Sequence, residues 1–259
     1  MNSKLVVITG GAGRIGSVFA RAVAENFGKA VIADIDEEFG RKTISNIVES
    51  TADKSIVDRI FFKEVDISSH ESVAQLVSDL RKEHSKIDAL VNNAYPRNKN
   101  YGKSFFEINS NDFSDFLTLH LGGYFNISQH FIRLFLEQGY GNIINISSIQ
   151  GVAAPAFETY EGTAMHSPVE YTVAKHGLIG MTKYMAKMFK KEGIRVNAIS
   201  PGGILAGQPE RFLMQYKKRC GTKGMLDSSD LTGALLYLLS DASKYMTGQN
   251  LIVDDGFGL

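Results

Sequence analysis

The chain has 259 residues, 44% of them hydrophobic and 22% charged, which suits one large or two small globular domains and excludes a disordered or fibrous protein. Lysine plus arginine and aspartate plus glutamate both total 28, so the formal net charge is zero and no overall field attracts nucleic acid or a membrane. The lone cysteine, Cys220, excludes a disulfide within the chain. The apolar run in MNSKLVVITG is too short for a signal peptide or a membrane span. We therefore expect a soluble cytoplasmic protein.

Short apolar segments alternate with longer segments of helical period along the whole chain. The apolar segments predict strands at residues 4–9, 29–34, 59–65, 87–92, 142–147, 194–200 and 250–255. The segments between them predict helices at residues 14–27, 37–50, 71–83, 112–137, 168–191 and 228–239. This alternation is typical of an α/β fold of the Rossmann type, with a mostly parallel, doubly wound sheet of seven strands covered by helices on both faces. We expect one domain over residues 1–259, with the strand order 3-2-1-4-5-6 and the seventh strand beside it.

Three stretches interrupt the regular alternation: residues 94–111, 151–167 and 202–227. Each one directly follows a predicted strand. Open α/β sheets bind their ligands at the carboxyl edge, so we expect these stretches to form the substrate loops.

A glycine-rich turn, TGGAGRIG at residues 9–16, joins the first predicted strand to the first predicted helix. Gly11, Gly13 and Gly16 satisfy the pattern G-x-G-x-x-G, in which glycine lets the backbone approach a pyrophosphate at the amino terminus of a helix. The alternative is a turn that only packs the helix against the sheet.

Asp34 ends the second predicted strand roughly 20 residues after the turn, where a carboxylate can accept both ribose hydroxyls. The same carboxylate repels a 2′-phosphate, which favours NAD over NADP. Arg14 has the opposite effect, because a cation in the turn can pair with that phosphate. We therefore expect NAD as the cofactor, with NADP as the less favoured alternative.

Tyr171 and Lys175 are four residues apart in a predicted helix and therefore share one face. A cation about 4 Å from a phenol stabilises the phenolate, although burial opposes this effect. Such a pair can exchange a proton with an alcohol while a nicotinamide carries the hydride. The alternative is an exposed aromatic residue beside a solvated lysine.

Eight motifs in order extend this pattern over essentially the whole chain, and together they resemble the short-chain dehydrogenase/reductase family. They are TGGAGRIG (9–16), IAD (32–34), VDI (65–67), VNNA (91–94), NIINISS (142–148), YTVAK (171–175), IRVNAISPGG (194–203) and TGQNLIVDDG (247–256).

The resemblance implies a catalytic role for Tyr171 as the acid/base and for Lys175 as its partner and as a ligand of the nicotinamide ribose. Ser148 would orient the substrate oxygen, whereas Ser147 is interpreted as satisfying the backbone at the strand end. The resemblance implies no metal. It implies cofactor contacts at Gly10, Gly13, Arg14, Ile15, Gly16, Asp34, Ile35, Asp66, Ile67, Asn93, Ala94, Tyr171, Lys175, Pro201, Gly202 and Ile204.

The chain departs from the family pattern in four places. The glycine spacing TGxxGxxG resembles the branch of the family that handles nucleotide sugars, and Tyr95 replaces the glycine that usually follows Asn-Asn-Ala. His120 replaces the asparagine of the family's proton relay. Because the family uses this residue partly through its backbone carbonyl, His120 either preserves the water chain, joins the relay itself, or makes a purely structural hydrogen bond. Residues 151–168 form an insertion between Ser148 and Tyr171, where the substrate must enter.

The loops indicate which substrate to expect. Two loops carry cations, namely Arg97, Lys99, Lys103, Arg211, Lys217, Lys218, Arg219 and Lys223. The insertion adds the polar residues Glu158, Tyr160, Glu161 and His166. These residues favour a small, sugar-like or anionic substrate, with a solvated loop face as the alternative.

The sequence is also similar to bacterial oxidoreductases of flagellin or surface-polysaccharide sugar modification. The favoured hypothesis is an NAD(H)-dependent oxidoreductase that interconverts a secondary alcohol and a ketone. The alternatives are a non-catalytic cofactor-binding regulator and a nucleotide-sugar epimerase or dehydratase. The family resemblance further implies a homodimer or homotetramer that pairs through the helices at residues 112–137 and 168–191.

Overall fold

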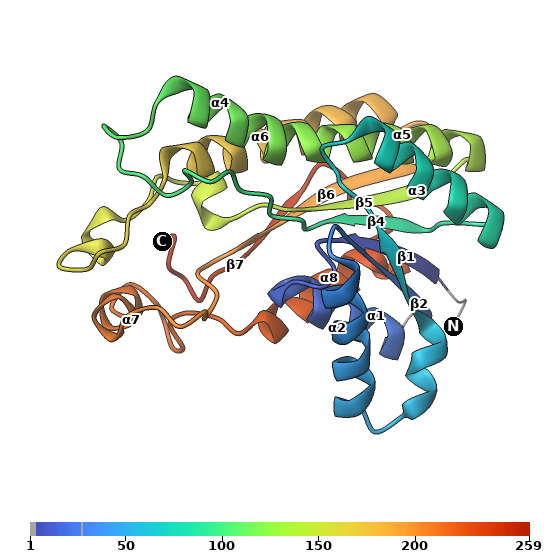
Figure 1. Cartoon of the computed structure of the whole chain (residues 1–259), viewed down its shortest axis with the longest axis horizontal. Coiled ribbons are helices and arrows are strands. Elements are labelled where there is room, and N and C mark those ends of the chain that lie inside the picture. Colours follow the sequence, from blue (N-terminus) through green and yellow to red (C-terminus); the bar gives the residue numbers. More distant parts are fainter. Residues whose placement is uncertain (1–3, 27) are drawn as a thin grey trace.

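Seven strands form one sheet through the middle of the molecule in the order β3-β2-β1-β4-β5-β6-β7 (Figure 1). The computed structural model describes residues 4–26 and 28–259. All pairings between neighbouring strands of this sheet are parallel. The strands are β1 (Lys4–Thr9), β2 (Gly28–Asp34), β3 (Ile60–Glu64), β4 (Ala89–Asn92), β5 (Gly141–Ile146), β6 (Ile194–Pro201) and β7 (Asn250–Val253). The predicted fold class and strand order are confirmed.

Helices cover both faces of the sheet, as Figure 1 shows. The lower layer contains α1 (Arg14–Asn26), α2 (Glu37–Ser50) and α8 (Thr232–Leu239), and the upper layer contains α3 (His70–Glu83), α4 (Ser110–Leu117), α5 (Gly123–Gln138) and α6 (Val169–Phe189). Short 3₁₀ helices span Lys54–Arg59, Ile149–Gly151, Phe157–Tyr160, Ser228–Leu231 and Asp241–Ser243. Each layer buries its own apolar core against the sheet, with Tyr124 and Phe131 in the upper core and Phe19 and Leu235 in the lower core.

Local sequence explains several of these boundaries. The Asp36 side chain accepts the Phe39 backbone N–H at 2.8 Å and caps α2, and the Ser69 hydroxyl caps α3 in the same way. Strand β7 ends at Val253, two residues before the predicted end, because Asp255 has a φ of 54° and turns the chain. The predicted helix at residues 14–27 ends at Asn26 in the structure, and its last residue, Phe27, lies outside the described residues.

Two features differ from the sequence-based expectation. The helix predicted at residues 112–137 contains a π-helical turn, Thr118–Gly122, which separates α4 from α5 and brings His120 into the upper core. The loop predicted at residues 202–227 contains the helix α7 (Glu210–Lys217). This helix is only 8 residues long and buries two side chains, Phe212 and Tyr216, so its periodic signal is weak.

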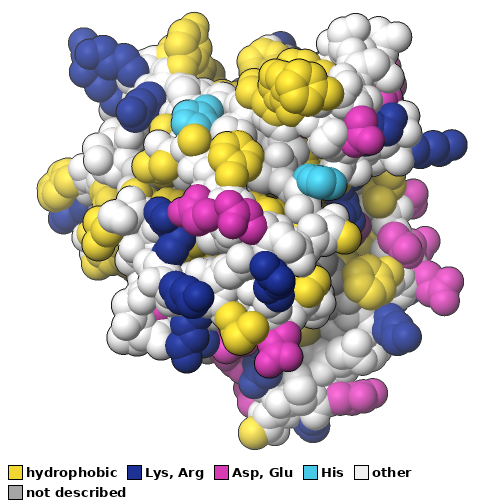
Figure 2. Space-filling model, turned by 90° about the vertical axis from the view of Figure 1, so that its left-hand side faces the viewer, with side chains coloured by type: hydrophobic (Ala, Val, Ile, Leu, Met, Phe, Trp, Pro, Cys, Tyr) yellow, Lys and Arg dark blue, Asp and Glu magenta, His cyan; other side chains and the backbone are white. Residues whose placement is uncertain are grey.

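The three interrupting stretches meet at the carboxyl edge of the sheet, on the left of Figure 1 together with α7 and the carboxyl terminus. At this edge Ile149, Phe212, Tyr216, Met225 and Phe257 form a third, small apolar cluster, against which Ala156, Tyr160 and Met165 of the stretch 151–167 pack. On this face of the molecule, basic and acidic side chains lie next to one another (Figure 2). Over the described part of the chain, no helix has the combination of length and apolar character that spanning a membrane requires.

Candidate active site

A cavity of about 1200 Å³ runs along the carboxyl edge of the sheet, from the glycine turn to the carboxyl-terminal tail. It collects nearly all of the predicted site residues: Gly10, Gly13, Arg14, Ile15, Asp34, Ile35, Asp66, Ile67, Asn93, Ala94, Ser148, Tyr171, Lys175, Pro201, Gly202 and Ile204 line it. Among the predicted residues, Gly16 and His120 lie behind the wall of the cavity.

The glycine turn brings the backbone close to the cavity. Gly10 has a φ of 60°, and a Cβ atom at this position would lie 2.6 Å from the Cα atom of Ala94. A Cβ atom on Gly16 would lie 2.2 Å from the Gly10 carbonyl oxygen, so Gly16 allows α1 to pack against the turn. Helix α1 begins at Arg14, and Gly13, Arg14 and Ile15 line the cavity, so the amino terminus of the helix, where N–H groups lack helical partners, lies at the cavity as a phosphate-binding turn requires.

Asp34 and Arg14 have different partners at this end of the cavity. The Asp34 carboxylate accepts the backbone N–H groups of Ala12 at 3.0 Å and of Ile35 at 2.9 Å. Its oxygens keep lone pairs for further donors, because a carboxylate accepts several hydrogen bonds. The Arg14 guanidinium instead donates to the Leu205 carbonyl oxygen at 3.1 Å and so ties α1 to the loop after β6.

Asn93 braces the turn from the neighbouring strand. Its side-chain amide donates to the carbonyl oxygens of Thr9 and Gly10, both at 3.0 Å. The Thr9 hydroxyl accepts the backbone N–H groups of Asn93 at 3.0 Å and Ala94 at 3.1 Å. The ends of β1 and β4 are therefore locked together beneath the cavity, and the lining and brace together fit a dinucleotide.

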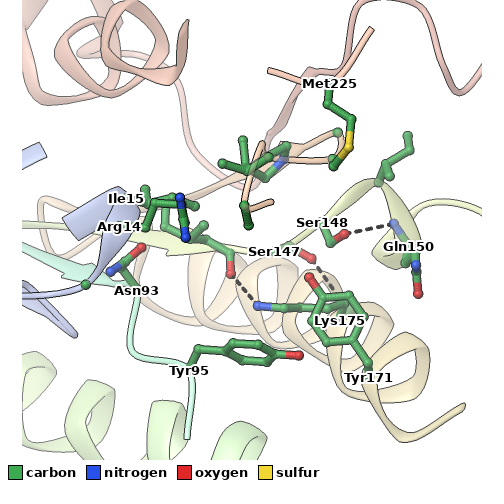
Figure 3. Close-up of a pocket in the computed structure, with 18 of the residues that line it drawn as sticks. Arg14, Ile15, Asn93, Tyr95, Ser147, Ser148, Gln150, Tyr171, Lys175 and Met225 are labelled. Carbon is green, nitrogen blue, oxygen red and sulfur yellow. Dashed lines mark hydrogen bonds between the residues drawn. The ribbon is translucent and has the colours of Figure 1, made fainter. Parts of the chain in front are cut away.

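Ser148, Tyr171 and Lys175 converge where the cavity passes the end of β5 (Figure 3). The Lys175 Nζ atom donates to the Ile146 carbonyl oxygen at 2.9 Å. The Ser148 Oγ atom accepts the Gln150 backbone N–H at 3.1 Å, which leaves its own proton free to be donated. Ser147, interpreted from the sequence as structural, donates its hydroxyl to the Lys175 carbonyl oxygen at 2.9 Å.

Burial controls the protonation of the tyrosine and the lysine. It lowers the pKa of Lys175, which is 4% exposed, to about 7. Burial also raises the pKa of Tyr171 above its usual value, and the Ser148 hydroxyl opposes this shift. The net lowering of the phenol pKa expected from the pair is therefore not found, because burial outweighs the effects that favour the phenolate. The ammonium lies 5.5 Å from the centre of the Tyr171 ring, over its face. Lys175 is buried, whereas Tyr171 is half-buried at the cavity wall.

His120 lies in an aromatic stack beneath this site. It is fully buried, and its ring is stacked between Phe116 at 5.4 Å and Tyr124 at 5.1 Å between centroids. Neither ring nitrogen has a hydrogen-bond partner among the described residues. Burial lowers the pKa of His120 well below its usual value, so the ring is neutral. Among the described residues, no partner for the structural hydrogen bond considered from the sequence is found, and the ring packs against Phe116 and Tyr124.

Several residues of the substrate end have no counterpart in the sequence motifs. Phe212, Tyr216, Met225 and Phe257 line this part of the cavity, and Phe257 stacks on Tyr216 at 4.1 Å between centroids. They come from α7, the loop that follows it and the carboxyl-terminal tail, which share no motif or regular spacing. Gln150 also lines the cavity, and its only sequence signal is its place two residues after Ser148.

The insertion packs against α7 and the residues that follow it. Glu158 forms an ion pair with Arg219, and the ring of Tyr160 meets that of Phe212 at 5.1 Å between centroids. The Glu161 carbonyl oxygen also accepts hydrogen bonds from two side chains, Arg211 and Gln215, both at 3.1 Å. The insertion and α7 together therefore wall the substrate end.

Only part of the predicted cationic charge reaches the cavity. Among the eight loop cations, Arg97 and Arg219 line it. Lys103 pairs with Asp112, and Lys223 pairs with Asp227 and Asp230. The cationic character of the substrate end is therefore smaller than the sequence suggests.

Comparison with known proteins identifies the family. A family model described as enoyl-(acyl carrier protein) reductase matches residues 10–258. The chain is 41% identical to post-translational flagellin modification protein A of Campylobacter coli, with 100% of both chains covered. It is 31% identical to 7alpha-hydroxysteroid dehydrogenase of Bacteroides fragilis, with 98% of this chain and 94% of that protein covered. A crystal structure of a short chain dehydrogenase from Leptospira borgpetersenii with bound NAD+ has a TM-score of 0.86 and 32% identity, covering 100% of this chain and 94% of the other. The chain therefore belongs to the short-chain dehydrogenase/reductase family, whose members are oxidoreductases acting on CH–OH groups.

Proposed function

We propose that the protein is an NAD(H)-dependent oxidoreductase that interconverts a secondary alcohol and a ketone. The observation that carries this proposal is the convergence of Ser148, Tyr171 and Lys175 on one cavity, which continues to the glycine turn. The single free cysteine, Cys220, fits a site of action in the cytoplasm, where thiols stay reduced.

The glycine turn, Asp34 and the brace at Asn93 would hold the dinucleotide. The free lone pairs of Asp34 favour a ribose with two hydroxyls, and Arg14 is engaged by Leu205 rather than directed at a 2′-phosphate. NAD is therefore the preferred cofactor. The bound NAD+ of the Leptospira relative agrees with this preference. A bound nicotinamide supplies or accepts the hydride.

The chain's own residues supply the proton chemistry. The Tyr171 hydroxyl gives a proton to the substrate oxygen in reduction and takes it back in oxidation. The Ser148 hydroxyl donates a hydrogen bond to the same oxygen, because the Gln150 N–H occupies only one of its lone pairs and its proton is left to be donated. Lys175 holds a positive charge against the Tyr171 ring and stabilises the phenolate when it forms.

The substrate end favours a small polar molecule with an apolar face. Aromatic rings such as Phe212 and Tyr216 pack on apolar faces, while Gln150, Glu158 and Arg219 donate to and accept from hydroxyls or an anionic group. We therefore propose a sugar-like or anionic substrate. The printed name of the Campylobacter coli relative supports a role in the modification of flagellin.

Two measurements on the purified chain test this proposal. Fluorescence titration is expected to give tighter binding of NADH than of NADPH. NAD-linked turnover over a panel of polyols, amino sugars and sugar phosphates is expected to give NADH with at least one compound. Protein that binds neither cofactor would contradict the proposal. NADH binding without turnover of any alcohol or carbonyl compound would favour the cofactor-binding regulator, and NAD retained through purification would favour the epimerase or dehydratase.

We further propose that the chain forms a homodimer or homotetramer through α5 and α6. These helices expose large apolar side chains, which monomeric surfaces seldom gather: Phe125, Leu136, Val173, Tyr184 and Met188. Light scattering on the purified protein is expected to give the mass of two or four chains. A concentration-independent monomer would contradict this assembly.

A further inference from the structure

Tyr95 occupies a position next to both proposed catalytic side chains. Tyr95 comes directly after Ala94 in the loop that follows β4, at the position where the family pattern has glycine. Its ring lies 5.5 Å from the Tyr171 ring between centroids, at an angle of 70°. In the view of Figure 3, the Lys175 side chain lies between the Tyr95 ring and Ser148. Tyr95 therefore contacts the site from the side opposite the serine.

The Lys175 ammonium is surrounded by aromatic rings. Its Nζ atom lies 5.8 Å from the ring centre of Tyr95, 5.8 Å from that of Tyr124 and 5.5 Å from that of Tyr171. These distances fall within the range of a cation–π contact. The hydrogen bond to the Ile146 carbonyl oxygen completes its surroundings. Three elements, the loop after β4, α5 and α6, each supply one ring.

The titratable groups described around Lys175 are neutral and do not compensate the charge of its ammonium. Tyr171 on α6, Tyr124 on α5, Tyr95 after β4 and His120 in the π-helical turn are the titratable groups that face it. Burial raises the pKa of all three tyrosines and lowers that of His120, so each of these groups is neutral near pH 7. Among the described carboxylates, none forms an ion pair with Lys175. The ring faces favour the charged ammonium, but the removal of water around Lys175 outweighs this attraction, because its pKa is lowered rather than raised.

The Tyr95 ring is itself held in place from the loop side. Its hydroxyl donates a hydrogen bond to the Tyr101 hydroxyl, and Tyr101 stacks on Phe116 at 5.1 Å and 22°. The Arg97 guanidinium lies 5.3 Å from the centre of the Tyr95 ring and 5.8 Å from that of Tyr101. Although Tyr95 is itself 40% exposed, its anchored ring covers the side of the Lys175 ammonium that it faces, whereas the glycine of the family pattern has no side chain at this position.

We propose that Tyr95 is a positioning residue for Lys175: its ring keeps water from the ammonium and holds it against three tyrosine faces, and so sets the pH at which Lys175 changes charge. This inference builds on the proposed roles of Lys175 and Tyr171 in proton transfer. Its test, however, needs no substrate and no turnover.

The test follows the Lys175 Nζ atom directly. The full-length chain is labelled with ¹⁵N-lysine, the Lys175 signal is assigned by its loss in Lys175→Arg, and its chemical shift is followed against pH. Tyr95→Phe keeps the ring and removes the hydroxyl, whereas Tyr95→Gly removes the ring. Tyr245→Gly applies the same change to a tyrosine that is 91% exposed and serves as the matched control. Circular dichroism and thermal unfolding check that each variant is folded.

In the wild-type chain and in Tyr245→Gly, Lys175 is expected to titrate near pH 7. In Tyr95→Phe the midpoint is expected to stay within about half a pH unit of that value, and in Tyr95→Gly to rise by at least about one unit toward the usual lysine value. An unchanged midpoint in Tyr95→Gly, or a wild-type midpoint near the usual ~10.4, would overturn the proposal.

A second variant covers the case in which Tyr95→Gly does not fold. Tyr101→Ala removes the hydrogen bond that anchors Tyr95, and it is expected to raise the midpoint by a smaller amount. An unchanged midpoint there would also contradict the proposal. Missing turnover with every alcohol tested, together with the expected titration shifts, would instead contradict the proposed function and leave the role of Tyr95 intact.

Discussion

The carboxylate of Asp34 accepts the backbone N–H of Ala12 at 3.0 Å, so the acid at the end of β2 is joined to the glycine turn. The same side chain therefore shapes the turn and faces the cavity where a ribose would lie.

The substitution Asp34→Asn tests the second of these roles. An amide oxygen can still accept the Ala12 N–H, but the negative charge and one acceptor are lost. Because hydrogen bonds to charged groups contribute about 1.5–3 kcal/mol, NADH affinity is expected to fall roughly ten- to hundredfold, while NADPH affinity falls less. Fluorescence titration with both cofactors measures this change. Arg41→Ala, at an exposed arginine outside the cavity, serves as the control and is expected to leave NADH affinity nearly unchanged; an equal loss of both cofactors in Asp34→Asn would contradict the assigned preference.

The ion pair between Arg219 and Glu158 joins the insertion to the residues after α7. Because both side chains are partly exposed, the pair contributes little to global stability, about 0–1 kcal/mol. Arg219→Ala is therefore expected to leave the thermal midpoint nearly unchanged and to loosen the insertion. Limited proteolysis with chymotrypsin, which cleaves after residues such as Phe157 and Tyr160, is expected to be faster in this variant. The neighbouring exposed Lys218→Ala is the control, and equal cleavage rates in both variants would mean that the pair does not restrain the insertion.

Asp255, which follows β7, anchors the loop after α7. The backbone of Asp255 itself has an unusual conformation. Its φ is 54°, and its carboxylate accepts the backbone N–H groups of Thr222 at 3.0 Å, Lys223 at 2.6 Å and Gly224 at 2.8 Å. These bonds lower the pKa of Asp255 to about 2. Asp255→Asn tolerates the backbone angle but replaces one acceptor oxygen by a donor, so the thermal midpoint is expected to fall at neutral pH.

The direction of the Asp255 pKa shift determines how the loss of thermal stability in Asp255→Asn depends on pH. A carboxylate whose folded pKa is depressed stabilises the fold above its unfolded pKa of about 3.9, and this contribution disappears as the pH falls through the folded value. The difference between wild type and Asp255→Asn is therefore expected to shrink between about pH 4 and pH 2. Thermal unfolding over this range measures the difference, with the exposed Asp58→Asn as the control. A difference that stays constant down to pH 2 would show that the carboxylate charge plays no part.

His120 is neutral, buried and without a hydrogen-bond partner among the described residues. Because an unsatisfied buried polar group is costly, His120→Phe is expected to raise the free energy of unfolding by about 1 kcal/mol, measured in urea. Turnover with the substrate found in the screen is expected to stay within about threefold of wild type. A loss of turnover with unchanged stability would instead place the imidazole in a proton relay.

The sequence predicts the sheet, its strand order and the cavity lining because each depends on short, local patterns. Strands buried on both faces are continuously apolar, and the glycine turn, Asp34 and the Tyr171–Lys175 pair lie at element ends that the alternation of strands and helices places at one edge. The family motifs add the positions that local patterns leave open, such as Asn93.

What the sequence does not predict depends on contacts between distant segments. The three rings around Lys175 come from three separate elements, and no spacing relates Tyr95, Tyr124 and Tyr171. Phe257 reaches the cavity only because Asp255 turns the tail back toward the loop at Thr222. The direction of the Tyr171 pKa shift also requires the structure, since helical spacing shows a nearby cation but not how much water burial removes.

The ratio of turnover in wild type to turnover in Tyr171→Phe tests the central claim most directly. It is measured as NADH formation from NAD+ and the first active compound of the screen, with Tyr245→Phe, at an exposed tyrosine, as the control. Loss of the general acid/base is expected to reduce kcat roughly 10²- to 10⁴-fold with NADH affinity unchanged, while Tyr245→Phe keeps wild-type turnover. Turnover of Tyr171→Phe equal to that of wild type would contradict the assignment of Tyr171 as the proton donor and acceptor.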